Sequence, residues 1–284
     1  MELALINILN GITFGIILFL VASGLSVIMG FMGVLNLAHG ALYILGAYFG
    51  LAALDYGVPF VLAALIGGIG VGLVGLILER IFLKPLHKQL NEQVLLTLGF
   101  VYIFANLARW IWGPYTKVVD APAIVSGYIS IGDAHYPVYR LVLIATGLAV
   151  AAGLWFFTEK TRIGSIIRAG MDDKEMTTGM GVNYGLVASA VFFTGAFVAG
   201  AAGFIGLPII AVQSGVVFQI LLLSLIVLVV GGVGRVEGTL LGAMAIGIID
   251  SLGKAYFPDF AYFTIYIVMI LILLVKPSGL LPRR

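Results

Sequence analysis

The sequence predicts an all-α fold, a polytopic transmembrane helical bundle, from three observations. Hydrophobic residues make up 62% of the chain, charged residues only 10%, and the mean hydropathy is +1.17. A soluble domain is roughly 45–50% apolar and about 25% charged. Apolar stretches recur at the length of about 20 residues that a helix needs to cross a bilayer. Glycine is frequent, 38 of 284 residues, which suits close helix packing in lipid. We therefore expect a single transmembrane domain over residues 1–284.

Nine apolar stretches are candidate membrane segments, so about 8–9 segments are expected. They cover roughly residues 8–31, 40–54, 58–79, 94–112, 139–157, 186–208, 216–232, 238–256 and 260–276. The 40–54 stretch is short for a complete crossing and is a candidate for a broken or re-entrant helix. The first stretch follows no basic region and no small-residue cleavage pattern, which favours a membrane span over a removable signal.

The distribution of Lys and Arg predicts the orientation. Of the 15 basic residues, 11 lie in the 79–93, 158–185 and 232–238 connections and in the 276–284 tail. Cytoplasmic connections carry the excess of basic residues, so these segments are expected inside. The C-terminus is then cytoplasmic. The N-terminus is external, provided that the 40–54 stretch crosses.

The 158–185 connection is the longest polar interruption on this side, and its 161–181 part reads as two short helices. An apolar stripe of helical period runs through Ile163, Ile166, Ile167, Gly170 and Met171. Thr161 is a candidate N-cap and Gly170 a candidate stop. Asp172 or Asp173 can cap a second helix that Gly179 closes. One interpretation is a solvated loop, and the other is an element that docks on a soluble partner.

The connection on the other side, at about 113–138, alternates apolar and polar residues and contains three prolines. This pattern predicts a short external hairpin.

Motifs of enzymes and of cofactor sites are absent from the sequence. It has no cysteine, its three histidines are scattered, and it lacks G-x-S-x-G, H-E-x-x-H and Walker A patterns. We therefore expect no catalytic residue, no metal site, no cofactor and no nucleic-acid partner for this chain, and any ATP would be used by a partner.

Polar residues near the membrane interior supply the candidate pathway. Asn36 and His39 lie in the NLAHG motif between two apolar stretches. Such residues are costly in a bilayer and are functional candidates by default. The alternative is that they cap the next helix at the cytoplasmic interface. A half-helix that begins near Gly40 would direct its N–H groups toward a substrate carboxylate.

Two further patterns concern packing and charge. Gly234, Gly238 and Gly242 recur every four residues, which predicts close helix packing. Asp250 and Lys254 are spaced to pair on one helix face. A proton relay or an ion pair at the membrane interface would both account for that pair.

These residues resemble a known family, the LivH-type permease subunits of branched-chain amino-acid ABC transporters, in a superfamily with the ribose permeases. The resemblance covers nearly the whole length. Its most specific parts are GVLNLAHGALYILGAY (33–48), TRIGSIIRAGMDD (161–173), MGVN (180–183), GAFVAGAAGFIGLP (195–208) and KPSGLLPRR (276–284).

The resemblance implies the fold of an ABC importer permease in a bacterial inner membrane, surrounded by lipid. It implies a second, homologous permease subunit, two ATPase subunits that hydrolyse ATP, and a periplasmic substrate-binding protein. Carried over by motif, the ATPase-coupling residues are Arg162, Gly164, Arg168, Ala169 and Asp172. Residues beside the pathway are Asn36, Ala38, His39 and Gly40.

The sequence departs from the family pattern at Ala41, at Ser165 and at Arg235–Glu237. An importer of another carboxylate, of an amide or of urea is therefore an alternative within the family. A different class is a secondary transporter driven by an ion gradient, with Asp250 and His39 as proton carriers. A purely structural membrane scaffold would explain neither the intramembrane polar residues nor the short second segment.

Overall fold

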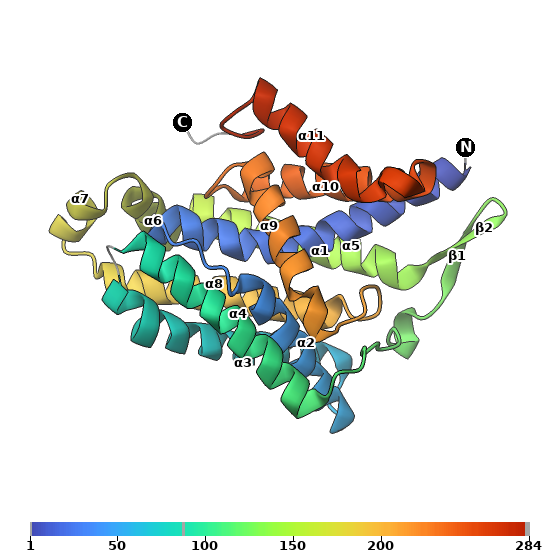
Figure 1. The fold of residues 1–284 in the computed structure, drawn as a ribbon, viewed down its shortest axis with the longest axis horizontal. Coiled ribbons are helices and arrows are strands. Elements are labelled where there is room, and N and C mark those ends of the chain that lie inside the picture. Colours follow the sequence, from blue (N-terminus) through green and yellow to red (C-terminus); the bar gives the residue numbers. More distant parts are fainter. Residues whose placement is uncertain (1, 87–88, 282–284) are drawn as a thin grey trace.

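The computed structural model describes residues 2–86 and 89–281 and is a helical bundle with one small hairpin (Figure 1). The α-helices are α1 (Glu2–Met32), α2 (His39–Asp55), α3 (Phe60–Ile77), α4 (Leu90–Trp112), α5 (Val138–Lys160), α6 (Arg162–Asp172), α7 (Lys174–Gly179), α8 (Tyr184–Ile205), α9 (Val217–Gly231), α10 (Val236–Tyr256) and α11 (Ala261–Val275). The strands are β1 (Tyr128–Ile131) and β2 (Ala134–Pro137). A π-helical turn, Leu78–Leu83, extends α3.

Six described segments are long and apolar enough to cross a membrane: Glu2–Met32, Phe60–Leu86, Leu90–Trp112, Val138–Lys160, Tyr184–Ile205 and Val236–Tyr256. The structure therefore supports a helical membrane bundle, but it does not show the 8–9 segments expected from the sequence. The difference arises because α2, α9 and α11 have only 17, 15 and 15 residues.

Helix α1 lies at the centre of the bundle and packs against α5, α8, α9 and α10. It approaches α10 closely through glycine, since a methyl group on Gly15 would lie 2.8 Å from the carbonyl oxygen of Ala243. Farther along α1, Gly24 approaches Gly195 of α8 in the same way. A methyl group on Gly24 would lie 2.9 Å from the Cα of Gly195. Small residues thus bring the backbones of three helices together, as is usual in lipid.

Helices α2, α3 and α8 meet at a second glycine crossing. A Cβ on Gly46 would lie 2.5 Å from the carbonyl carbon of Gly200, and one on Gly67 would lie 2.6 Å from the carbonyl oxygen of Gly46. A real Cβ does not approach a backbone this closely, so the crossing requires glycine.

The short apolar stretch at 40–54 lies within α2, which is continuous over its 17 residues, so the broken helix considered there is not found, and the non-helical residues lie before α2. Residues 33–37 after α1 are not helical, and α2 then begins inside the bundle. There His39 Nε2 lies 2.9 Å from the carbonyl oxygen of Val21 in α1. The N–H of Leu37 donates to Thr97 Oγ1 of α4 at 3.3 Å. An irregular stretch that ends in a turn, followed by a helix, therefore carries the chain through the interior (Figure 1).

The two ends of the bundle differ. The N-terminal end of α1 lies near the β1–β2 hairpin, and we call this the hairpin end (Figure 1). Helices α6 and α7 and the C-terminal segment lie at the opposite end, the α6 end. The hairpin that the sequence predicts is present: its strands pair antiparallel from Tyr128↔Pro137 to Ile131↔Ala134. Gly132, with φ of +64°, is in the connecting turn.

Candidate functional site

The polar segment 161–181 forms two capped helices at the α6 end. Thr161 Oγ1 accepts the N–H of Gly164 at 3.0 Å, which caps α6. Asp173 Oδ1 accepts the N–H of Met176 at 2.9 Å, which caps α7. The predicted stop at Gly170 is wrong: α6 continues to Asp172, because Gly170 is buried against the ring of Phe31, where a Cβ would lie 2.6 Å from a ring carbon.

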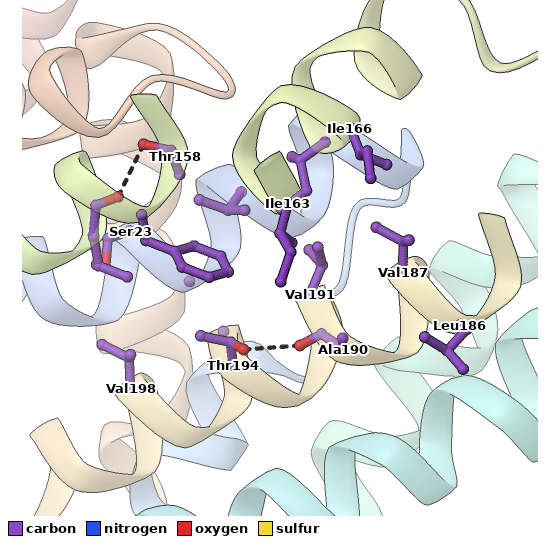
Figure 2. Close-up of a pocket in the computed structure, with 16 residues that line it drawn as sticks. Ser23, Thr158, Ile163, Ile166, Leu186, Val187, Ala190, Val191, Thr194 and Val198 are labelled. Carbon is purple, nitrogen blue, oxygen red and sulfur yellow. Dashed lines mark hydrogen bonds between the residues drawn. The ribbon is translucent and has the colours of Figure 1, made fainter. Parts of the chain in front are cut away.

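The apolar side of α6 lies over α1, α5 and α8. Ile167 is 3% exposed, whereas Ile163 is 50% exposed. An apolar cavity of about 160 Å³ lies beneath α6, and Figure 2 shows the side chain of Ile163 directed toward α8, beside Val191. The helix is therefore seated on an incompletely filled surface, which permits a small shift at low cost in packing.

The five coupling candidates do not form one face of α6. Arg162, Ala169 and Asp172 are exposed, whereas Gly164 is buried against the last turn of α5. A Cβ on Gly164 would lie 2.6 Å from the carbonyl carbon of Thr158, so only glycine permits this contact.

Arg168 also attaches α6 to α5. Its guanidinium donates to the carbonyl oxygen of Thr158 and lies 3.5 Å from a carboxylate oxygen of Glu159. Both side chains are more than a third exposed, so the ion pair itself contributes at most about 1 kcal/mol. Sequence reasoning missed Glu159, because its partner Arg168 lies nine residues later on a separate helix and no regular spacing connects the two.

A cleft of about 660 Å³ opens at the α6 end. It lies between α5, α6, the α9–α10 turn and the tail, and its charged lining residues are Glu159, Arg168, Asp172 and Arg235. Arg235 also lies 3.9 Å from Glu237. The cleft therefore combines both signs of charge where the sequence predicts docking.

Helix α7 is attached to α8. The Lys174 ammonium lies 4.5 Å from the centre of the Tyr184 ring, in a cation–π contact. Partial burial lowers the pKa of Lys174 from its ordinary value. Lys174 lines a small cavity together with Glu79, a buried acid of the π-helical turn that accepts a 2.7 Å hydrogen bond from Ser189. Sequence reasoning missed Glu79. The available signal was that an acidic residue ends the apolar stretch predicted at 58–79, where the helix then changes to a π-helical turn.

The four pathway candidates lie together in the core at the break before α2. Asn36, Ala38 and His39 are 0% exposed, and Gly40 is also buried. A Cβ added to Gly40 would lie 2.5 Å from the carbonyl oxygen of Val217 in α9. Asn36 Oδ1 accepts the N–H of Ala38 at 3.0 Å. Among the described residues, Asn36 Nδ2 and His39 Nδ1 have no hydrogen-bond partner. None of the four lines the α6-end cleft.

The glycine series lies where α10 begins. The N–H of Gly234, in the α9–α10 turn at φ of +79°, donates to Ser26 Oγ of α1 at 3.0 Å. A Cβ on Gly238 would collide with Gly231 of α9, and one on Gly242 would lie 2.9 Å from the Gly231 nitrogen. The start of α10 is thereby held against α1 and α9.

Comparison with known proteins identifies the family. The model of the branched-chain amino acid transport system / permease component family matches residues 7–273. The chain belongs to this family. This permease is 26% identical to the high-affinity branched-chain amino acid transport system permease protein BraD of Pseudomonas aeruginosa, over 98% of this chain and 95% of the relative. It is 28% identical to LivH of Escherichia coli, over 96% and 94%.

An archaeal relative extends the range of the family. The probable branched-chain amino acid transport permease protein LivH of Methanocaldococcus jannaschii is 26% identical over 96% of this permease and 91% of the relative. Among solved structures, PsaBC from Streptococcus pneumoniae in complex with Fab matches with a TM-score of 0.49 and 11% identity, over 94% of this chain and 89% of that chain. That similarity is too distant to bear on function.

Proposed function

We propose that this permease is the membrane subunit of an ATP-binding-cassette importer for branched-chain or related hydrophobic amino acids. In this proposal it forms the pathway with a second, related permease in the inner membrane. The observation that supports it best is the exposed side of α6, with Arg162, Ala169 and Asp172, on a helix that contacts α5 through Gly164 and Arg168. The names of the full-length relatives support the substrate class.

Two ATPase subunits would dock on α6 and α7 and push them as they close on ATP. A push on α6 would reach α5 through Gly164 and Arg168, and α1 through the contact of Gly170 with Phe31. A push on α7 would reach α8 through Lys174 and Tyr184. Such contiguous contacts let a rigid element bias the arrangement of spanning helices. ATP would be bound and hydrolysed by the partners, and the permease itself would bind no cofactor.

The α6 end would face the cytoplasm, with the C-terminus inside and the N-terminus outside. The excess of basic residues supports this orientation. Lys88, Arg283 and Arg284, which contribute to that excess, lie outside the described residues. A periplasmic binding protein would deliver substrate at the hairpin end, near the 113–138 loop.

Charge reversal by Arg162→Glu tests the docking surface. Arg162 is exposed, and its side chain forms no hydrogen bond or ion pair with the residues that the structure describes, so the fold should survive. We expect ATP-driven leucine uptake into proteoliposomes that contain the four membrane-associated subunits and the binding protein to fall about tenfold or more, because the new carboxylate would face a partner surface that is complementary to a cation, and like charges across an interface cost several kcal/mol. Co-purification of the ATPases should fall in parallel.

The matched control is Arg109→Glu, the same change at the last turn of α4 on the hairpin end, which should retain the ATPases. Normal uptake and ATPase retention in Arg162→Glu would refute the docking role. ATP-driven uptake of an aromatic carboxylate, an amide or urea instead of leucine would keep the transporter class and change the substrate. Uptake driven by a proton gradient without any ATPase, and lost in Asp250→Asn, would replace the proposal by a secondary transporter.

A further inference from the structure

A second polar cavity lies at the hairpin end, remote from α6. Its volume is about 630 Å³, within the roughly 300–1,000 Å³ range of small-molecule sites. It is built from α1, α5, α9, α10 and the segment that follows α8. Its charged lining residues are Arg140, Asp250 and Lys254, and its apolar ones include Phe14, Ile209 and Ile210. Five segments that are distant in sequence therefore meet around one cavity.

Arg140, in the first turn of α5, is a cation without an acidic partner in the part of the chain that the structure describes. Among the described residues no carboxylate forms an ion pair with it, although Nη1 donates to Asn10 Oδ1 of α1. The guanidinium also lies 5.8 Å from the centre of the Tyr136 ring. These two contacts fix the guanidinium and leave Nε and Nη2 without a partner among the described residues. That edge has the geometry for bidentate recognition of a carboxylate.

Asp250 supplies an acceptor in the same cavity. Its side chain is 10% exposed, and its Oδ2 accepts a 2.6 Å hydrogen bond from Lys254. Its Oδ1 makes no hydrogen bond with the described residues, so the carboxylate can accept from a second ammonium. Lys254, 56% exposed, also lies 5.3 Å from the centre of the Phe14 ring, which holds the pair beside an apolar wall.

We propose that this hairpin-end cavity binds the zwitterionic backbone of an amino acid after its release at the outer face. Arg140 binds the carboxylate, Asp250 Oδ1 accepts from the ammonium, and Phe14 with Ile209 and Ile210 contacts an apolar side chain. The inference deepens the proposed import function and rests on it. It places part of the substrate selectivity in the permease, in addition to any selectivity of a binding protein.

Binding to the unaltered full chain tests the ligand chemistry. The purified permease in phosphatidylcholine nanodiscs is titrated with radiolabelled leucine without ATP and without binding protein, and competitors are then added. We expect displacement by unlabelled leucine. Leucinamide, which lacks the carboxylate, and 4-methylvalerate, which lacks the ammonium, should each bind about ten to a hundredfold more weakly, because each loses charge-assisted hydrogen bonds. Equal competition by all three would overturn the proposal.

Variants then assign the residues. Arg140→Gln and Arg140→Lys should each weaken leucine binding, the second because an ammonium cannot replace the fork of a guanidinium. Arg109→Gln removes the same charge at the same end from a helix that does not line the cavity, and it should bind as the unaltered chain does. Gel filtration and the melting temperature of each variant separate loss of binding from loss of the fold.

The outcomes distinguish this inference from the import function. ATP-driven leucine uptake that persists unchanged in a folded Arg140→Gln variant would overturn the cavity assignment and leave the import function standing. Absence of ATP-driven uptake in the unaltered complex would instead overturn the import function. Leucine binding that disappears when phosphatidylethanolamine replaces phosphatidylcholine would assign the cavity to a lipid headgroup and overturn the proposal.

Discussion

Replacing Gly46 by alanine is expected to destabilise the permease by about 3 kcal/mol or more, the upper part of the range for overpacking a core. The added Cβ would lie 2.5 Å from the carbonyl carbon of Gly200. Both atoms belong to helix backbones, and no side chain there can rotate away. Helices α2 and α8 would have to separate, which would also disturb the contact of Gly67 with Gly46. The measurement is thermal or denaturant unfolding of the purified chain in detergent.

Gly153→Ala is the matched control, because the same methyl group would meet nothing within 4 Å on α5. Alanine is favoured over glycine in a helix by about 0.5–1 kcal/mol, so this variant should be as stable as the original chain or slightly more stable. Equal unfolding midpoints for Gly46→Ala and Gly153→Ala would show that α2 and α8 do not cross as the structure has them.

Gly164→Ala is expected to reduce ATP-driven uptake by about tenfold or more, because in the proposed mechanism the contact of Gly164 with α5 carries the movement of α6 to the spanning helices. The Cβ would collide with the last turn of α5, 2.6 Å from the carbonyl carbon of Thr158. Helix α6 would therefore tilt away from α5 and weaken the contacts of Arg168 with Thr158 and Glu159. Because α6 lies at one end of the bundle, the melting temperature should change little.

The control is Gly179→Ala at the end of α7, where a Cβ would meet nothing within 4 Å. It makes the same chemical change in the same 158–185 connection and should retain uptake. Uptake in Gly164→Ala equal to that in Gly179→Ala would contradict transmission through the α5–α6 contact. ATP hydrolysis that continues in Gly164→Ala without uptake would be the signature of uncoupling.

The local features of segment 161–181 were readable in the sequence because they depend on neighbouring residues. Thr161 and Asp173 each cap the helix that follows by accepting an N–H group three residues later. Such a bond needs only a short polar side chain at a helix start. The hairpin at 128–137 was readable for the same reason, and the apolar composition alone was sufficient to predict the membrane bundle.

Which residues of a helix are buried and which are exposed depended on the tertiary structure. The apolar stripe of α6 predicted which side would face the bundle, but only contact with α5 separates Gly164 and Arg168 from the exposed Arg162 and Asp172. Similarly, the NLAHG motif predicted polar groups near the membrane interior. Their complete burial beside Val21 follows from where α1 and α4 lie.

By itself the sequence determined the class of protein, the family and the capped helices, because composition, motifs and caps can be read from the order of the residues alone. The tertiary structure alone decided that α2 starts inside the bundle. It also brought Arg140 and Asp250, which are 110 positions apart, to one cavity. Those arrangements depend on which helix backbones approach each other, and the approach is decided by glycine contacts between distant segments such as Gly46 and Gly200.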